Sequence, residues 1–156
     1  MTTLSLRDDD ARIVYVAVAY HLGRPGAEAN IEAGLAPVYD ALAAQFGRAQ
    51  STLELSAYQL GRIAEALLGL TNELKQYDLS GRRTAVPGLA DAIARCFPEL
   101  APGAPDDGAS ALDLVADVVA LRRRLAAALE PPEPAPEPTV SDDDDVRPWW
   151  RRMGRS

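Results

Sequence analysis

The chain has 156 residues, of which 47% are hydrophobic and 25% are charged, and its formal net charge at pH 7 is −7. This length predicts one folded domain plus an appendage, large enough to bury a core without disulfides. The negative charge disfavours nucleic acid as a partner, because a phosphate backbone would be repelled on average. We therefore look for a protein, a small molecule or a membrane surface as partner.

Composition and the first residues predict a cytoplasmic protein. Residues 1–10 lack the basic start and the apolar run of a signal peptide, and no stretch approaches the roughly eighteen apolar residues of a membrane span. The single cysteine, Cys96, excludes an intramolecular disulfide and is expected to be a small core residue. Arginine is abundant and Lys75 is the only lysine, a bias typical of a GC-rich bacterial coding sequence.

Three helix-start patterns organise the chain: Ser5-x-x-Asp8, Ser56-x-x-Gln59 and Ser110-x-x-Asp113. The first predicts a helix over 7–22. Because residues 12–20 are apolar on every side and rich in β-branched side chains, a buried strand is the competing prediction. The aspartates at 8–10 favour the helix, since acids in a first turn complement the helix dipole.

A second helix is predicted over 31–46. Its apolar stripe consists of Ile31, Leu35, Val38, Leu42 and Phe46. Pro37 either kinks this helix or marks its true first turn.

The third predicted helix has the clearest pattern, because its apolar residues recur at steps of three and four from residue 60 to residue 77. These residues are Leu60, Ile63, Leu67, Leu70, Leu74 and Tyr77. Such a seam faces a neighbouring helix along its whole length. We expect close backbone approach at Ala57, Gly61 and Ala64, and the part of the seam from Leu60 to Leu74 is a candidate surface for homo-oligomer formation.

Two further helices are predicted, over 87–97 and 110–130. Residues 52–55 alternate like a strand but have no evident partner, so we interpret them as an extended lead-in to the third helix. Residues 1–130 are thus predicted to form an all-α domain, a compact bundle of four or five helices.

Residues of the kind that carry catalysis are sparse. His21 is the only histidine, so His-based metal pairs cannot form, and a structural histidine is the favoured interpretation. Phosphate-cradling glycine loops and nucleophile elbows are absent from the sequence. We predict no catalytic residue, metal or cofactor, and a non-enzymatic function. A helical hydrolase or nucleotide-binding domain that uses scattered carboxylates is an alternative.

The C-terminal 26 residues carry the strongest functional signal. Residues 131–140 alternate proline with glutamate or alanine and predict an extended linker. Residues 141–156 begin with an acidic run, 142–145, and continue into a segment rich in tryptophan and arginine, and this tail is predicted to be disordered. Its candidate partner-binding residues are Arg147, Trp149, Trp150, Arg151 and Arg152. Adjacent tryptophans on a tail that cannot fold alone indicate that another surface receives them.

Three receivers fit this tail. A groove on a partner protein could bury an indole and pair the arginines at its rim, and we favour this interpretation. An anionic membrane would attract the same residues, but binding would be weak because the neighbouring aspartates are repelled. Single-stranded nucleic acid, stacking on the indoles, is the third receiver and fits least. The alternative to all three is a tail without a partner, or one that folds back on the chain's own acidic domain. We therefore predict a protein-interaction or regulatory module.

Overall fold

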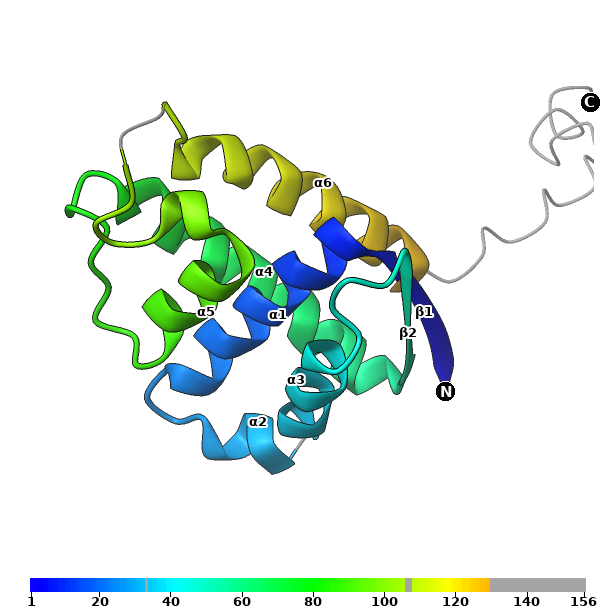
Figure 1. The fold of residues 1–156 in the computed structure, drawn as a ribbon. Coiled ribbons are helices and arrows are strands. Elements are labelled where there is room, and N and C mark those ends of the chain that lie inside the picture. The colour runs from blue at the N-terminus through cyan, green and yellow to red at the C-terminus, as the bar shows by residue number, and fades with distance from the viewer. Residues whose placement is uncertain (33, 106–107, 130–156) are drawn as a thin grey trace, which may run out of the picture.

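The computed structural model describes residues 1–32, 34–105 and 108–129. These residues form six α-helices, one short 3-10 turn and a two-stranded sheet (Figure 1). Helix α1 contacts α3, α4 and α5, and α6 packs on α4. The mostly helical class predicted from the sequence is confirmed, but the all-α description is incomplete because a small sheet is present.

The sheet pairs the first residues of the chain with a segment about fifty residues later. Strand β1 (Thr2–Arg7) runs antiparallel to β2 (Gln50–Leu55), with Leu4 opposite Leu53. Side chains of β2 alternate between exposed and buried, so one face of the strand rests on the core. The interpretation of residues 52–55 as an unpaired lead-in is therefore wrong.

Helix α1 (Asp8–Gly23) is the central element of the core. Val14, Val16 and Val18 have no exposed surface, which explains why this segment is apolar on every side. The strand alternative for residues 12–20 is thereby overturned in favour of the helix. The predicted cap at Ser5 is also wrong: the residue before α1 is Arg7, in an extended conformation, and its side chain makes no cap hydrogen bond.

The second predicted helix is divided into two shorter ones. Helix α2 (Glu28–Glu32) is followed by Gly34, whose φ of +80° suits glycine, and α3 (Leu35–Ala43) begins there. Pro37 therefore lies in the first turn of α3, where proline is tolerated, and does not kink a long helix. Ile31 is 58% exposed, so the buried stripe starts only at residue 35.

Helix α4 (Ala57–Tyr77) begins with the capping box that the sequence predicts. The Ser56 hydroxyl accepts a hydrogen bond from the backbone N–H of Gln59, and the Gln59 side chain accepts one from the backbone N–H of Ser56. Both bonds satisfy amides that the helix leaves without partners at its first turn.

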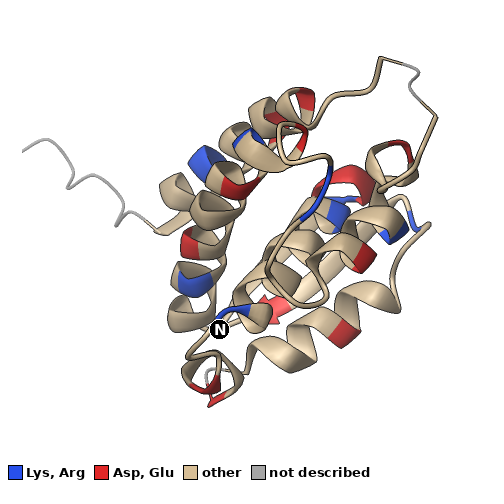
Figure 2. Cartoon of the chain, turned by 90° about the vertical axis from the view of Figure 1, so that its left-hand side faces the viewer, with Lys and Arg blue, Asp and Glu red and all other residues tan. Residues whose placement is uncertain are grey.

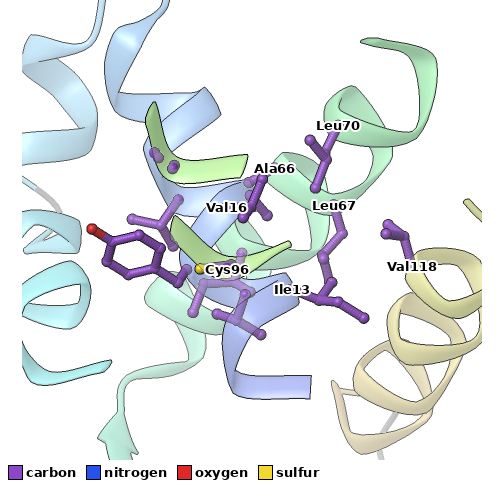
Figure 3. Packing of buried hydrophobic residues seen from close by; sticks show 14 of the residues in the cluster. Ile13, Val16, Ala66, Leu67, Leu70, Cys96 and Val118 are labelled. Atoms are coloured by element: carbon purple, nitrogen blue, oxygen red, sulfur yellow. The ribbon is translucent and has the colours of Figure 1, made fainter. Parts of the chain in front are cut away.

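The apolar seam of α4 is buried between α1 and α6. Figure 3 shows Ile13 of α1, Leu67 of α4 and Val118 of α6 pointing toward one another. The seam residues from Leu60 to Tyr77 are at most 2% exposed. In this structure they form part of the chain's own core.

The close approach predicted for α4 occurs at a different glycine. A Cβ atom on Gly61 would meet no other residue within 4 Å. On Gly69 it would lie 2.4 Å from the ring of Tyr20 in α1. The absence of a side chain at Gly69 therefore leaves room for the Tyr20 ring of α1.

The last helices largely follow the prediction. Helix α5 (Leu89–Cys96) ends before a 3-10 turn, η1 (Pro98–Leu100), and α6 (Ala111–Leu129) closes the described chain. The buried residues of α6 include Leu114, Val118, Leu121 and Leu125. Leu112 and Leu129 of the same helix are 58% and 37% exposed.

Two charged residues join the end of α4 to the following loops. The Asp78 carboxylate accepts hydrogen bonds from the Ser110 hydroxyl and the backbone N–H of Ala111, and it pairs with Arg82. The Arg82 guanidinium also donates to backbone carbonyls of Glu99 and Ala109. Arg82 is therefore a structural link between these loops.

Within the described residues, no helix combines the length and the apolar composition that a membrane span requires.

Candidate functional site

The tail residues predicted to bind a partner lie outside the described residues. They are Arg147, Trp149, Trp150, Arg151 and Arg152, together with the linker at 131–140. The structure therefore leaves their prediction as it stands. A site within the described residues has to be sought on the folded body.

One hollow on the described body is a groove between the start of α1, the end of α5 with η1, and the first turns of α6. It has a volume of about 440 Å³, within the range of about 300–1,000 Å³ that is usual for ligand pockets. Four carboxylates line it: Asp9, Glu99, Asp113 and Asp117. We refer to this hollow as the acidic groove.

Apolar side chains form part of the same lining. They are Ile13, Phe97, Leu100 and Leu114. Ile13 and Leu100 are 3% exposed and Leu114 is 7% exposed, so they form a rigid floor that belongs to the core. A groove with an apolar floor and acidic rims suits a ligand that is both apolar and cationic.

The four carboxylates of the groove are held by no hydrogen bond or ion pair among the described residues, although Asp9 lies near enough to Arg12 to help raise the pKa of its guanidinium. Each of these residues is exposed, and none of their side chains forms a hydrogen bond or ion pair with another described side chain. Arg12, the one cation among the described lining residues, is held by Asp8 at 2.8 Å and lies over the ring of Phe46. The Arg12 guanidinium lowers the pKa of Asp8, and the Asp8 carboxylate raises the pKa of Arg12.

Acidic positions are spread over several elements of the body and do not gather at one point (Figure 2). Among the described residues, no three His, Cys, Asp or Glu side chains lie close enough together to hold a metal ion. The groove can therefore offer separate contacts to several cationic groups along its length.

Cys96 borders the groove but is 5% exposed. Burial raises the pKa of its thiol to about 11, although Arg12 and Arg95 oppose this shift. A thiol with such a pKa is almost fully protonated at neutral pH and is a poor nucleophile. The prediction that Cys96 is a core residue is confirmed by its burial.

Another pocket, of about 290 Å³, lies at the end of α1. Its lining includes His21, Arg24, Asn30, Arg62 and Glu65. The Asn30 amide donates to the backbone carbonyl of His21 at 3.3 Å, and Arg62 pairs with Glu65 at 2.8 Å. We refer to this hollow as the His21 pocket.

The imidazole of His21 is 5% exposed, and neither ring nitrogen has a hydrogen-bond partner of good geometry among the described residues. Burial lowers its pKa, and Arg24 and Arg62 lower it further. Asn30 lies near enough to favour the protonated ring, but this effect is smaller. His21 is thus a buried, neutral side chain, and this conformation presents neither nitrogen to a substrate.

The sequence contained one signal for the acidic groove that our interpretation missed. Asp113 and Asp117 are four residues apart, a spacing that places both on the same face of a helix. We had interpreted Asp113 as part of a capping box. Asp9 and Glu99 come from segments distant in sequence, and only the fold of the body brings them to the same groove as the start of α6.

Comparisons with models of protein families, with curated proteins and with solved structures found no match to this chain.

Proposed function

We propose that this chain is a non-enzymatic protein-interaction module. In this proposal the C-terminal motif Arg147-Pro-Trp-Trp-Arg-Arg docks on a partner protein, and the folded body contributes the acidic groove as a second contact surface. The observation that supports it best is the groove itself, in which exposed, unpaired carboxylates surround an apolar floor. Such surfaces recognise segments that combine arginine or lysine with aromatic side chains.

A peptide library displayed against the full chain tests the groove. Enriched peptides should combine basic and aromatic residues. Their binding should weaken when Asp113 and Asp117 are both replaced by Asn, because two charge contacts are lost. The matched control replaces Asp40 and Asp91, two exposed acids outside the groove lining, and should leave binding unchanged. Peptides without basic residues, or equal loss with both double variants, would refute a groove-directed function.

Affinity capture from the source cells tests the tail. A bait with Trp149→Ala and Trp150→Ala should lose proteins that the unaltered chain retains, while its far-ultraviolet circular dichroism stays the same. The body is expected to keep its fold because the described core contains neither residue. Identical captured proteins for both baits would contradict the proposed role of the motif.

A membrane receiver predicts a different result. Arginines that bind an anionic lipid surface should release it as salt rises, since charge attraction over a surface is screened. The aspartates at 142–145 and the net negative charge of the chain oppose such binding. Flotation with vesicles containing phosphatidylserine, at low and high salt, distinguishes this case from a protein partner.

The acidic groove also supports a second candidate, a helical hydrolase or nucleotide-binding domain. Four carboxylates in one hollow are the feature that such chemistry would require. Against it stands their spacing, which brings no three of them within reach of one metal ion. A rise in melting temperature with Mg²⁺ and a nucleotide, lost in the Asp113→Asn, Asp117→Asn double variant, would favour this candidate over the interaction module.

A further inference from the structure

We propose that the acidic groove is the docking site for the C-terminal motif of the same chain, residues 147–152. In this docked state the motif and the groove cover one another. A partner protein can bind the motif or the groove only after it has displaced this contact. The inference rests on the proposed function, because it takes the motif to be a recognition element.

Charge complementarity is the first argument. The groove presents the carboxylates of Asp9, Glu99, Asp113 and Asp117, all exposed and none in a hydrogen bond or ion pair within the described chain. The motif carries three arginines, at 147, 151 and 152. Arginine is well suited to pair with several carboxylates at once, because its guanidinium holds five donors in a planar fork.

The apolar floor supplies the second argument. An indole ring gains most when its faces leave water and its N–H still finds an acceptor. The floor of Ile13, Phe97 and Leu114 offers apolar contact, and the carboxylates around it are acceptors. The hollow, at about 440 Å³, is large enough for one indole.

The local helix dipole does not weaken the negative field of the groove. The groove adjoins the first turn of α6, where free backbone N–H groups would carry partial positive charge. Here the Asp78 carboxylate accepts a hydrogen bond from the first of them, the N–H of Ala111, and another from the Ser110 hydroxyl. The positive end of α6 is thus offset by an acid that belongs to the structure.

Reach is the third argument. Helix α6 ends at Leu129, twelve residues after Asp117, which is about 18 Å along the helix axis at 1.5 Å per residue. Residues 130–146 connect this end to the motif and can span up to about 50 Å at roughly 3.1 Å per residue. The motif can therefore return to the groove of its own chain. A tether this short also gives an effective concentration on the order of millimolar, which favours this contact over one between copies.

The chain offers a direct optical test, because Trp149 and Trp150 are its only tryptophans. Their fluorescence reports the motif alone. In the full chain, emission should be shifted to shorter wavelength and be quenched less by acrylamide than in a synthetic peptide of residues 141–156. The Asp113→Asn, Asp117→Asn variant and 1 M NaCl should both move these values toward those of the peptide. The Asp40→Asn, Asp91→Asn control should match the unaltered chain.

Exchanging the charges of the motif and the groove tests whether docking can be restored. Arg151→Glu with Arg152→Glu should release the motif, and combining it with Asp113→Arg and Asp117→Arg should restore the shifted emission. Failure of this rescue while circular dichroism stays native would count against the groove as the receiver. If the shift grows with protein concentration, the motif binds a second copy, and docking within one chain is wrong.

The two proposals fail separately. Peptide-like emission in the full chain overturns the docked motif, yet the interaction module stands if the Trp149→Ala, Trp150→Ala bait still loses its partners. The converse result is a full chain that shows the shifted emission of a docked motif while the unaltered and Trp149→Ala, Trp150→Ala baits capture the same proteins. That result would refute binding of the motif to a partner protein and leave only its contact with the groove of the same chain.

Discussion

Arg124 donates two hydrogen bonds to the carboxylate of Asp10, with N···O distances of 2.9 and 3.1 Å. The two residues are 114 positions apart, one near the end of α6 and the other in the first turn of α1. The Asp10 side chain is 7% exposed, whereas the Arg124 side chain is 55% exposed. The pair therefore joins the last described helix to the central one and gives a buried carboxylate its main cationic partner.

Replacing Arg124 by Gln should lower the free energy of unfolding by about 1–2 kcal/mol, because the buried Asp10 carboxylate would lose both charge-assisted hydrogen bonds. Arg7, at 3.9 Å and largely exposed, cannot replace them. Urea denaturation of the full chain measures the change. The matched control is Arg123→Gln, an exposed neighbour, which should change stability by no more than about 0.5 kcal/mol. Equal effects of the two variants would show that the Asp10 contact contributes nothing.

Two glycines of α4 should respond in opposite directions to the same substitution. Gly69→Ala places a methyl group 2.4 Å from the Tyr20 ring, so overpacking should cost about 1–3 kcal/mol. Gly61→Ala meets nothing within 4 Å and should stabilise the helix by about 0.5–1 kcal/mol. Melting temperatures of the two variants check the sign. A stabilising Gly69→Ala would mean that α1 and α4 are not packed as closely as the structure has them.

Helices with a complete local signal could be predicted from sequence. The seam of α4 and its cap at Ser56 involve residues three or four apart. Their spacing alone therefore predicts a helix and its first residue. Helix α1 has no one-sided apolar stripe in its sequence, because it is buried on several sides. The three aspartates of its first turn nevertheless distinguished it from a strand.

What the sequence failed to predict depends on partners far along the chain. The alternation of β2 was visible, but its partner β1 lies about fifty residues earlier, and the pattern Ser5-x-x-Asp8 was interpreted as a cap. The break at Gly34 was hidden because an apolar stripe continued across it. The acidic groove could not be assembled from sequence, since its rims come from α1, η1 and α6.

Asp78 should be needed for the ordered start of α6. Its carboxylate accepts from the N–H of Ala111 at 2.8 Å and from the Ser110 hydroxyl at 3.1 Å, the role that an N-cap side chain usually fills. Asp78→Ala should lower the free energy of unfolding by about 1–2 kcal/mol, because it also removes the partner of Arg82.

Hydrogen exchange locates that effect. Amides at the start of α6 should exchange faster in Asp78→Ala, while those in the middle of α1 should keep their relative protection. Asp91→Ala removes an exposed acid from α5 and serves as the control. Unchanged protection at Ala111 would show that the carboxylate does not hold this helix end.

His21 should make stability depend on pH near neutrality. Burial lowers the pKa of the imidazole below its ordinary value of 6.5, so the unfolded chain takes up a proton at a higher pH than the folded one. The free energy of unfolding is then highest above pH 6.5 and decreases as the pH falls from 6.5 toward the lower folded pKa. Because the chain contains no other histidine, few other side chains titrate in this window.

The His21→Gln variant isolates this contribution. Urea denaturation at intervals between pH 7.5 and 5 should give a shallower dependence for the variant than for the unaltered chain, whatever its absolute stability. An NMR titration of the imidazole should place its folded pKa below 6.5, the ordinary value. Two outcomes would contradict this prediction: a parallel loss of stability in the two chains, or an imidazole that titrates at or above 6.5. Either would show that the His21 ring is solvated or paired, and not buried without a partner as in the structure.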